Sequence, residues 1–478
     1  MKNLISSVDL SNDNRPRACY FVLWHGFCIF VVCMKREVYE GILKYLKDVI
    51  AWSEYENHVF AVGGCCRDCL KNREIKDIDL VIDLPNGGIE FANWLYNKGK
   101  LVYEPVVYQN FGTAMFHLKE FPEIELEAVQ TRKECYRDIN SRDPETAFGT
   151  ITDDCTRRDF TYNAIYYDIS HGTFCDYNSN SLEDLDKNIL RTCGDPDVIF
   201  MEDPLRILRA VRFMSRFGST IEEKTFEGMK RNVDRLGIIS RERIHDEFMK
   251  MCNERDYHQT CDAFFTLWDI GAFKYIIPSF GNFTHKDVYF YMQSLRKVLS
   301  WGHVFGLTKE GMFATILFGD DNAEQVLRDL KCPNEFIDEV MFLINTNKEF
   351  DRRLGEEIDV DCEAATTLFR EYAHICGSRK RMLNMMWCGD ERGLSAYYFD
   401  YDEYGDCLFD ELYKSEEKFF TYELPVDGED VMRELGIGPS KEVGDTLKKL
   451  WKFVYGNPTK DSREELLKYL NYVKSEKI

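Results

Sequence analysis

The sequence predicts an α/β head with a small mixed β-sheet, followed by an all-α region. Three observations support this. From His58 to about Asp168, short β-branched runs alternate with Gly, Pro and Asn breaks, a pattern typical of mixed α/β structure. After Leu182 the pattern is almost wholly helical, with apolar residues at every third or fourth position. A chain of 478 residues is long enough for about three domains.

Composition narrows the class of protein. Hydrophobic residues make up 44% and charged residues 30%, which excludes disordered, collagen-like and multi-span membrane classes. The net charge of −22 argues against coating nucleic acid through bulk charge, so an RNA or nucleotide would need local basic patches or metal ions. The 17 cysteines show no paired zinc-type spacing, which favours reduced thiols and a cytoplasmic location.

The N-terminal segment from Ala18 to Met34 allows two interpretations. It is apolar apart from His25 and follows two arginines, as in a secretion signal or a short membrane span. It has no clear small-residue cleavage site and ends at a methionine that opens an amphipathic helix. We therefore predict that Met34 is the true start, that residues 1–33 are a non-native or targeting extension, and that no membrane is a partner.

The first predicted strand begins near Val59 and ends in Gly63 and Gly64, directly before a helix that starts CCRDCL. Paired glycines at such a turn let backbone N–H groups approach a phosphate closely. The alternative is an ordinary tight turn. Cys66 and Cys69 form C-x-x-C without a second pair, so we interpret them as small helix-packing residues.

The next strand, DIDLVID, places Asp77 and Asp79 on one face and Ile78, Leu80 and Ile82 in the core. Magnesium prefers oxygen ligands, and paired ions activate an attacking hydroxyl and neutralise a leaving pyrophosphate. An isolated D-x-D is more often an exposed acidic strand edge. Its neighbouring motifs favour the metal site here.

A third acid is expected on the strand EIELEAV, where Glu125 and Glu127 share a face. We assign Glu127 to the third carboxylate of a two-metal site and expect Glu125 to face solvent.

The motif RRDFTYNAI offers guanidinium forks for phosphate through Arg157 and Arg158. Asp159 and Asn163 can bind ribose hydroxyls, whereas Phe160 belongs to the core. The alternative for the arginine pair is a solvated charged turn.

In EDPLRILRAVRFMSRFG, Asp203 and Pro204 are an ordinary helix start and Gly218 an ordinary stop. Four arginines nevertheless fall on one broad side of this helix and form a basic stripe: Arg206, Arg209, Arg212 and Arg216. Asp203 and Arg206, one turn apart, can read the edges of bases through complementary hydrogen bonds.

Six motifs in this order resemble class II CCA-adding enzymes, the bacterial-type tRNA nucleotidyltransferases, whose head motifs bacterial poly(A) polymerases share. They are GG-x-x-RD, KDIDLV, E-x-x-x-T-R, RRDFTYNAI, EDPLRILRAVRF and SRERIHDEFMK, and the resemblance runs from His58 to about Pro278. It implies a nucleotidyltransferase head (palm) followed by an all-α neck, body and tail. The implied ranges are 34–170 for the head, 171–255 for the neck, 256–350 for the body and 351–478 for a tRNA-binding tail.

The resemblance also implies roles for single residues. Asp77 and Asp79 would be catalytic and bind Mg²⁺, with Glu127 as a catalytic helper. The implied nucleotide-binding residues are Gly63, Gly64, Arg67, Arg157, Arg158, Asp159, Asn163, Glu202, Asp203, Arg206 and Arg209. Asp203 and Arg206 would read the incoming base.

Further segments bear on substrate. Residues 132–150 are similar to the flexible loop with which CCA-adding members switch from C to A, which disfavours a CC-only enzyme. The tail phrase GIGPSKEVG can hold an RNA phosphate or be a simple turn. A departure is Phe318-Gly319-Asp320, which stands where an HD phosphohydrolase domain would carry His-Asp, so we do not expect phosphohydrolase activity. His285 and His303 are isolated, which is typical of structural histidines.

The predicted function is therefore magnesium-dependent transfer of CMP and AMP, from CTP and ATP, to the 3′ ends of tRNA. A poly(A) polymerase that accepts only ATP and a non-catalytic RNA-binding relative are the alternatives.

Overall fold

The computed structural model describes residues 19–24, 27–32, 36–109, 112–135, 145–252, 257–282, 296, 307–357, 362–388 and 418–475. The chain divides into two compact units, Met1–Ile238 and Ile239–Ile478. Within the described ranges, no helix has the length and apolar character needed to cross a membrane. The predicted five-part division into extension, head, neck, body and tail stays a prediction.

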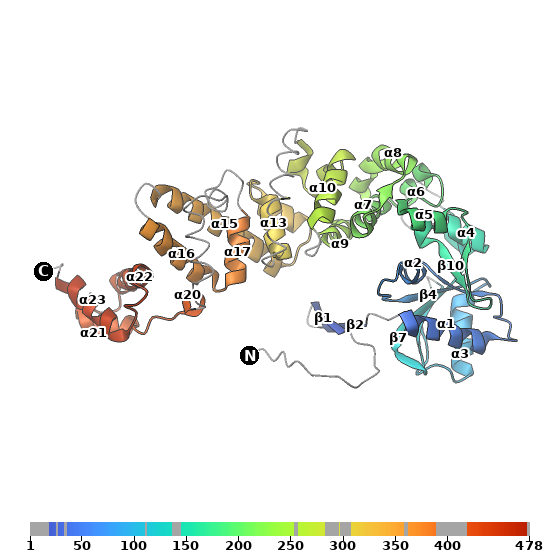
Figure 1. Ribbon diagram of the computed structural model, residues 1–478, viewed down its shortest axis with the longest axis horizontal. Helices are drawn as coiled ribbons and strands as arrows, with labels where there is room; N and C mark the ends of the chain where they lie inside the picture. Colours follow the sequence, from blue (N-terminus) through green and yellow to red (C-terminus); the bar gives the residue numbers. More distant parts are fainter. Residues whose placement is uncertain are drawn as a thin grey trace. The chain divides into compact units, whose positions relative to one another are not determined.

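A seven-stranded sheet forms the centre of the first unit (Figure 1). Its spatial order is β11-β10-β3-β4-β7-β6-β5. Only β4 and β7 are parallel neighbours, so the sheet is mixed, as predicted. The strands are β3 (Val59–Val62), β4 (Ile78–Ile82), β5 (Val106–Tyr108), β6 (Thr113–Leu118), β7 (Phe121–Gln130), β10 (Ile165–Asp168) and β11 (Thr173–Asp176).

One face of the sheet is covered by α3 (Gly87–Asn97), which packs across β4, β6 and β7. Ile78, Leu80 and Ile82 are fully buried, which confirms their predicted core position. The close approach requires a glycine, because a Cβ at Gly87 would lie 2.5 Å from Cγ2 of Ile82.

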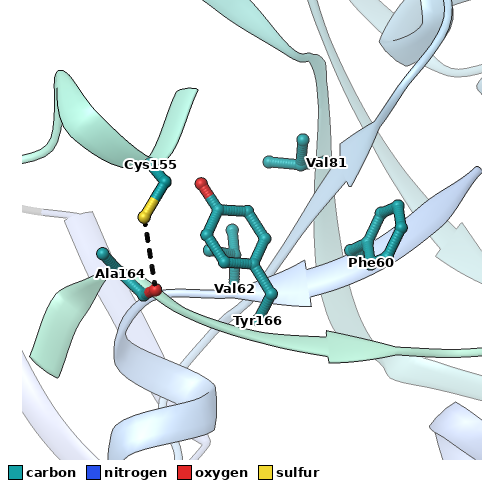
Figure 2. Packing of buried hydrophobic residues seen from close by; sticks show 6 residues of the cluster. All are labelled: Phe60, Val62, Val81, Cys155, Ala164 and Tyr166. Atoms are coloured by element: carbon teal, nitrogen blue, oxygen red, sulfur yellow. Dashed lines mark hydrogen bonds between the residues drawn. The ribbon is translucent and has the colours of Figure 1, made fainter. Parts of the chain in front are cut away.

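The opposite face of β3, β4 and β10 carries a second apolar cluster, shown in Figure 2. It joins Val62 and Val81 to Tyr166 on β10 and to Cys155 on α4 (Ile151–Thr156). The Cys155 thiol donates a hydrogen bond to the carbonyl oxygen of Ala164 (3.9 Å). Asp79 precedes Val81 on the same face of β4. The cluster therefore supports the strand that carries this carboxylate.

Helices complete the first unit. They are α1 (Arg36–Ile50), α2 (Gly64–Leu70), α5 (Ser181–Lys187), α6 (Pro196–Glu202), α7 (Leu205–Phe217) and α8 (Glu223–Asn232), with short 3₁₀ turns η2 (Thr161–Asn163) and η3 (Val233–Ile238). Cys66 and Cys69 are buried on α2, in agreement with a packing role.

Two short strands, β12 (Ile189–Leu190) and β13 (Thr220–Ile221), pair in parallel among these helices. They are short exceptions in a region that is almost wholly helical, as predicted after Leu182. Two-residue strands are too short to show a periodicity of their own.

Two hairpins also belong to this unit. β1 (Cys19–Trp24) and β2 (Phe27–Val32) pair in the apolar N-terminal segment, which the structure shows as a β-hairpin. β8 (Arg132–Cys135) and β9 (Glu145–Phe148) form the arms of the predicted flexible loop. The remainder of that loop, residues 136–144, lies outside the described residues.

The described part of the second unit is helical, as predicted. Its helices are α9 (Arg241–Met251), α10 (Tyr257–Asp269), α11 (Phe273–Ile276), η4 (Pro278–Asn282), α13 (Lys309–Leu317), α14 (Ala323–Asp329), α15 (Asn334–Glu357), α16 (Cys362–Cys376), α17 (Arg379–Trp387), α20 (Lys418–Thr421), α21 (Gly428–Leu435), α22 (Lys441–Gly456) and α23 (Arg463–Ser475). Within the predicted tail, α21, α22 and α23 share a core that includes Val431, Leu450 and Leu466.

At the predicted HD remnant, Asp320 has local structural partners. Its carboxylate accepts hydrogen bonds from Ser279 Oγ (2.5 Å) and from the backbone N–H of Asn322 (2.8 Å). His285 and His303 lie outside the described residues, as does much of the acidic segment after Asp351.

Candidate active site

The strand register brings three carboxylates to one part of the sheet. Asp77 directly precedes β4, Asp79 is the second residue of β4, and Glu127 on β7 is the parallel register partner of Asp79. The glycine turn lies beside them: a Cβ at Gly63 would be 3.7 Å from Asp79 Oδ2, and one at Gly64 would be 4.0 Å from Asp77 Oδ1. The structure thus brings the first two sequence motifs together.

The carboxylates carry concentrated negative charge. Burial, together with the charges of Asp77 and Glu127, raises the pKa of Asp79 to about 7, although Arg158 opposes the shift. Burial and the charge of Asp77 likewise raise the pKa of Glu127. Glu125 is exposed, as predicted. A divalent cation would relieve this repulsion.

The donor set of Asp77 and Asp79 fits Mg²⁺, which is commonly held by one or two carboxylates together with phosphate oxygens of the substrate. Among the described residues, no group of three or more His, Cys, Asp or Glu side chains is placed to hold a metal ion. Glu127 therefore does not complete a three-carboxylate cage in this structure, and its helper role stays a prediction.

The turn before α2 requires a glycine. Gly63 has φ 79° and ψ −130°, a conformation that residues with a Cβ rarely adopt. Its backbone N–H donates to Ile165 (3.3 Å), and its carbonyl oxygen accepts from the backbone of Arg67 (3.1 Å). A Cβ at Gly63 would lie within 4 Å of Asp79, Arg158 and Asn163.

Arg67 is buried beside this turn. Its guanidinium donates two hydrogen bonds of 2.9 Å to the carboxylate of Asp68, and its Nη1 donates to Oδ1 of Asn163. The group also lies 4.6 Å from the centroid of the Phe217 ring. Arg67 is thus rigidly held, and its predicted contact with a triphosphate stays a prediction.

Arg157 and Arg158 share one buried carboxylate, that of Asp154 on α4. Arg157 donates to Oδ1 (3.0 and 2.5 Å), and Arg158 donates to Oδ2 through Nε and Nη2 (3.1 and 3.0 Å). The Tyr166 hydroxyl donates to the same Oδ2 (2.7 Å), and its ring forms part of the cluster in Figure 2. The arginine pair is therefore not a solvated turn.

Sequence reasoning missed Asp154. Burial alone would raise its pKa, but the two guanidinium groups and the Tyr166 hydroxyl lower the pKa to about 2. The residue lies three and four positions before the arginines, the spacing at which charges meet on a helix. That spacing was the available signal.

One guanidinium nitrogen of Arg158, Nη1, faces the glycine turn. Nε and Nη2 are occupied, whereas Nη1 would lie 3.8 Å from a Cβ at Gly63 and forms no hydrogen bond to a described residue. Positive charge is therefore presented at the glycine turn, next to Asp79.

Asp159 connects the RRDFTYNAI motif to α7 through hydrogen bonds from Arg209. Arg209 donates two hydrogen bonds to Oδ2 of Asp159 (2.9 and 2.6 Å), and Asn163 Nδ2 donates to Oδ1 (3.0 Å). Although burial opposes it, Arg209 lowers the pKa of Asp159. Phe160 is fully buried, as predicted.

Arg206 is anchored at the start of α7. Its Nη1 donates to Ile199 O (3.2 Å) and Glu202 (3.0 Å), and its Nη2 donates to Arg157 O (3.1 Å). Nε–H and one N–H of Nη2 have no partner among the described residues. Two donors of Arg206 are therefore available to a base edge, next to Asp203.

The predicted helix limits hold with a small shift. The Asp203 carboxylate accepts from the backbone N–H of Leu205 (3.1 Å), so it caps α7, which begins at Leu205. Gly218 ends the helix with φ 62°.

The predicted basic stripe is not a row of equivalent charges, because Arg206 and Arg209 pair with carboxylates. Arg212 and Arg216 instead lie over the rings of Phe213 (4.3 Å) and Phe217 (5.2 Å).

Two family models match the chain. The poly A polymerase head domain matches residues 59–191, and the probable RNA and SrmB-binding site of polymerase A matches residues 218–283. The head-domain match contains all the candidate site residues except Glu202, Asp203, Arg206 and Arg209, which lie between the two matched ranges.

The chain is also similar in sequence to curated CCA-adding enzymes and to a curated poly(A) polymerase. A CCA-adding enzyme of Lactobacillus johnsonii is 33% identical over 45% of this chain and 50% of its own. Poly(A) polymerase I of Escherichia coli is 32% identical over 45% of this chain and 46% of its own. The chain thus spans about half the length of these relatives. A CCA-adding enzyme of Ligilactobacillus salivarius is 27% identical over 88% of this chain and 93% of its own.

Solved structures show the same fold. The Thermotoga maritima CCA-adding enzyme complexed with tRNA aligns with a TM-score of 0.66 at 22% identity, covering 92% of this chain and 96% of its own. The Bacillus stearothermophilus CCA-adding enzyme in complex with CTP aligns with a TM-score of 0.63 at 21% identity, covering 93% and 100%. Residues 59–191 therefore belong to the poly A polymerase head-domain family, and the chain as a whole is similar in sequence and fold to CCA-adding enzymes.

Proposed function

We propose that the protein is a CCA-adding tRNA nucleotidyltransferase that transfers CMP and AMP from CTP and ATP to tRNA 3′ ends. The observation that carries the proposal is one convergence. Asp77 and Asp79 lie beside a bare glycine turn, and Arg158 presents a free nitrogen at the same turn. Paired carboxylates next to a cationic cradle suit the chemistry of a nucleoside triphosphate.

The choice of tRNA over other RNA is supported by the extent of the similarities. Similarity to a CCA-adding enzyme extends over 88% of this chain, whereas similarity to poly(A) polymerase I covers 45%. The aligned structures of CCA-adding enzymes, one in complex with tRNA and one with CTP, also cover more than nine-tenths of this chain. The helical second unit is thus shared with that type of enzyme.

The chain's own residues position the reactants. Asp77 and Asp79 would hold magnesium, which when bound neutralises triphosphate charge and lowers the pKa of an attacking hydroxyl. Gly63 lets the triphosphate approach the backbone, and Arg158 offers a guanidinium N–H to a phosphate oxygen. Positioning and charge stabilisation then supply most of the acceleration, with no covalent protein intermediate.

Base selection is assigned to the start of α7. Arg206 is fixed by three hydrogen bonds, so its two remaining donors have a defined direction. The carboxylate of Asp203 supplies acceptors one turn away. Donors and acceptors at fixed positions can distinguish the edges of cytosine and adenine.

The test is an extension assay on a tRNA transcript that ends before CCA. We expect CTP alone to add C residues, ATP alone to add little, and both together to complete CCA. Asp79→Asn should be inactive in every reaction. Full activity of Asp79→Asn would contradict the assignment of this carboxylate.

A poly(A) polymerase is the second candidate, favoured by the head-domain match and by the E. coli relative. It would extend both tRNA and unstructured RNA with ATP alone and would ignore CTP. A non-catalytic RNA-binding relative would bind tRNA without any transfer. The same assay, together with a binding measurement, separates all three.

A further inference from the structure

A separate pocket of about 160 Å³ adjoins Arg67 in the first unit. Its wall comes from α2 and the loop that follows it, from η2, from α5 and the residue after it, and from the end of α7. The charged residues of the wall are Arg67, Asp68, Lys71 and Arg73, and the ring of Phe217 lies among them. Arg67, a predicted nucleotide-binding residue, lines this pocket, but none of the three candidate catalytic carboxylates does, so the pocket is separate from the carboxylate site.

The pocket is positively charged. Asp68 is the acidic residue of its wall, and both oxygens of that carboxylate are bound by Arg67. Lys71 and Arg73 are exposed and form no ion pair with a described residue. Two positive charges therefore remain uncompensated in a protein whose net charge is −22.

A further cation, Arg216, directly precedes the pocket-lining residue Phe217. Arg216, in the last turn of α7, is 5.2 Å from the centroid of the Phe217 ring and forms no ion pair with a described residue. Burial and the charge of Arg67 lower the pKa of Arg216, although Asp68 opposes the shift. The cations repel one another, and an anion would remove that repulsion.

The phenyl ring of Phe217 holds two guanidinium groups in place. The Cζ atoms of Arg67 and Arg73 lie 4.6 and 4.5 Å from its centroid. Such contacts limit the freedom of an arginine while its N–H donors stay available at the edge of the guanidinium plane. The side chain of Arg73 donates no hydrogen bond to a described residue.

We propose that Lys71, Arg73 and Arg216 form a phosphate-binding site at this pocket, separate from the carboxylate site. Arginine forks and a lysine ammonium are the groups that bind phosphate oxygens best. The choice of phosphate among anions rests on the proposed function, because every anionic reactant and product of that reaction carries phosphate. The source is a phosphate of the RNA backbone or a free pyrophosphate.

The test compares the double variant Lys71→Gln/Arg73→Gln with the control Lys119→Gln/Lys224→Gln. The control also removes two exposed charges from the first unit, and neither lysine forms an ion pair with a described residue. The full-length proteins are titrated with a short single-stranded RNA, by fluorescence anisotropy at several salt concentrations, and with inorganic pyrophosphate, by calorimetry. Divalent cations are omitted so that binding at the carboxylate site contributes little.

We expect the Lys71/Arg73 variant to lose affinity while the control retains it. Weaker RNA binding, with the salt slope reduced by about 0.7 for each lost phosphate contact, identifies the RNA backbone as the source. A loss confined to pyrophosphate identifies the free anion. Affinities equal to those of the control for both probes would overturn the site.

A third variant, Arg216→Gln, tests the same pocket from α7 and should weaken the same probe. The readouts require no catalysis, so they do not depend on the extension assay. A protein that adds CCA normally yet shows no loss in these titrations overturns only the phosphate site. An inactive protein that shows the loss contradicts only the proposed function.

Discussion

The carboxylate of Asp154 binds Arg158 through two hydrogen bonds to a single oxygen, at 3.1 and 3.0 Å. The remaining oxygen serves Arg157. One buried side chain thus sets the direction of both arginines of the RRD motif.

Asp154→Asn should strongly impair both stability and nucleotide binding. The substitution removes the buried counter-charge that two partly buried guanidinium groups share, which costs about 3–5 kcal/mol. Urea denaturation and thermal melts measure this loss.

A milder variant separates positioning from folding. Tyr166→Phe removes the hydrogen bond to Asp154 and leaves both ion pairs, so the loss of stability should be about 1 kcal/mol. We expect a higher KM for CTP and ATP with kcat largely retained. An unchanged KM with a lower melting temperature would show a purely structural role.

Low pH should weaken the ion pairs of Asp154 with Arg157 and Arg158. The pKa of Asp154 is lowered to about 2 in the folded protein, against about 3.9 in an unfolded chain. Its contribution is therefore complete above about pH 4 and is lost as the pH falls toward 2, up to about 2.5 kcal/mol. The difference in unfolding free energy between wild type and Asp154→Asn should shrink over that interval, and a constant difference would contradict this assignment.

Asp79→Asn should abolish transfer while stabilising the metal-free head. Loss of several kcal/mol of charge stabilisation corresponds to at least about a thousandfold in rate. The pKa of Asp79 is raised to about 7, so keeping it ionised at pH 8 costs stability, on the order of 4 kcal/mol. Melts in EDTA at pH 8 should show a higher midpoint for the variant, whereas a lower midpoint would show that its ionised form stabilises the fold.

Arg209 and Asp159 should be energetically coupled. Arg209→Gln leaves the buried Asp159 without its main partner, and Asp159→Asn removes the charge that Arg209 neutralises. A double-mutant cycle should give about 1–3 kcal/mol of coupling. Additive effects on unfolding would show that this pair does not fasten α7 to the head.

Arg206→Lys should change the choice between nucleotides. Lysine retains the charge but not the planar donors, which are worth about 1–3 kcal/mol when they read a base. The ratio of kcat/KM for CTP to that for ATP should shift by roughly tenfold or more. Arg231→Lys, on α8 and paired with Asp197, is the control and should leave the ratio unchanged.

The sequence predicted those features whose signal is local. Alternation placed Ile78, Leu80 and Ile82 in the core, and glycine with helical periodicity located the stop of α7 at Gly218. Family motifs placed the carboxylates beside the glycine turn. Local patterns suffice where each residue's environment follows from its near neighbours.

The rest depends on contacts between distant parts of the chain. Asp154, on α4, was missed because its burial depends on contacts with other elements, among them Tyr166 on β10. The pairing of Arg209 was not predicted because its partner lies 50 residues earlier, at Asp159. The phosphate pocket joins α2 to the end of α7, a proximity that neither segment indicates alone.

The one parallel pairing in the sheet has a consequence for how the molecule assembles. β4 and β7 are separated in the sequence by α3, β5 and β6, so their pairing is a contact between distant parts of the chain. Contacts of this kind form slowly during folding. A slip of one residue there would turn Glu127 away from Asp79. We therefore expect catalytic competence to be among the last properties acquired during refolding.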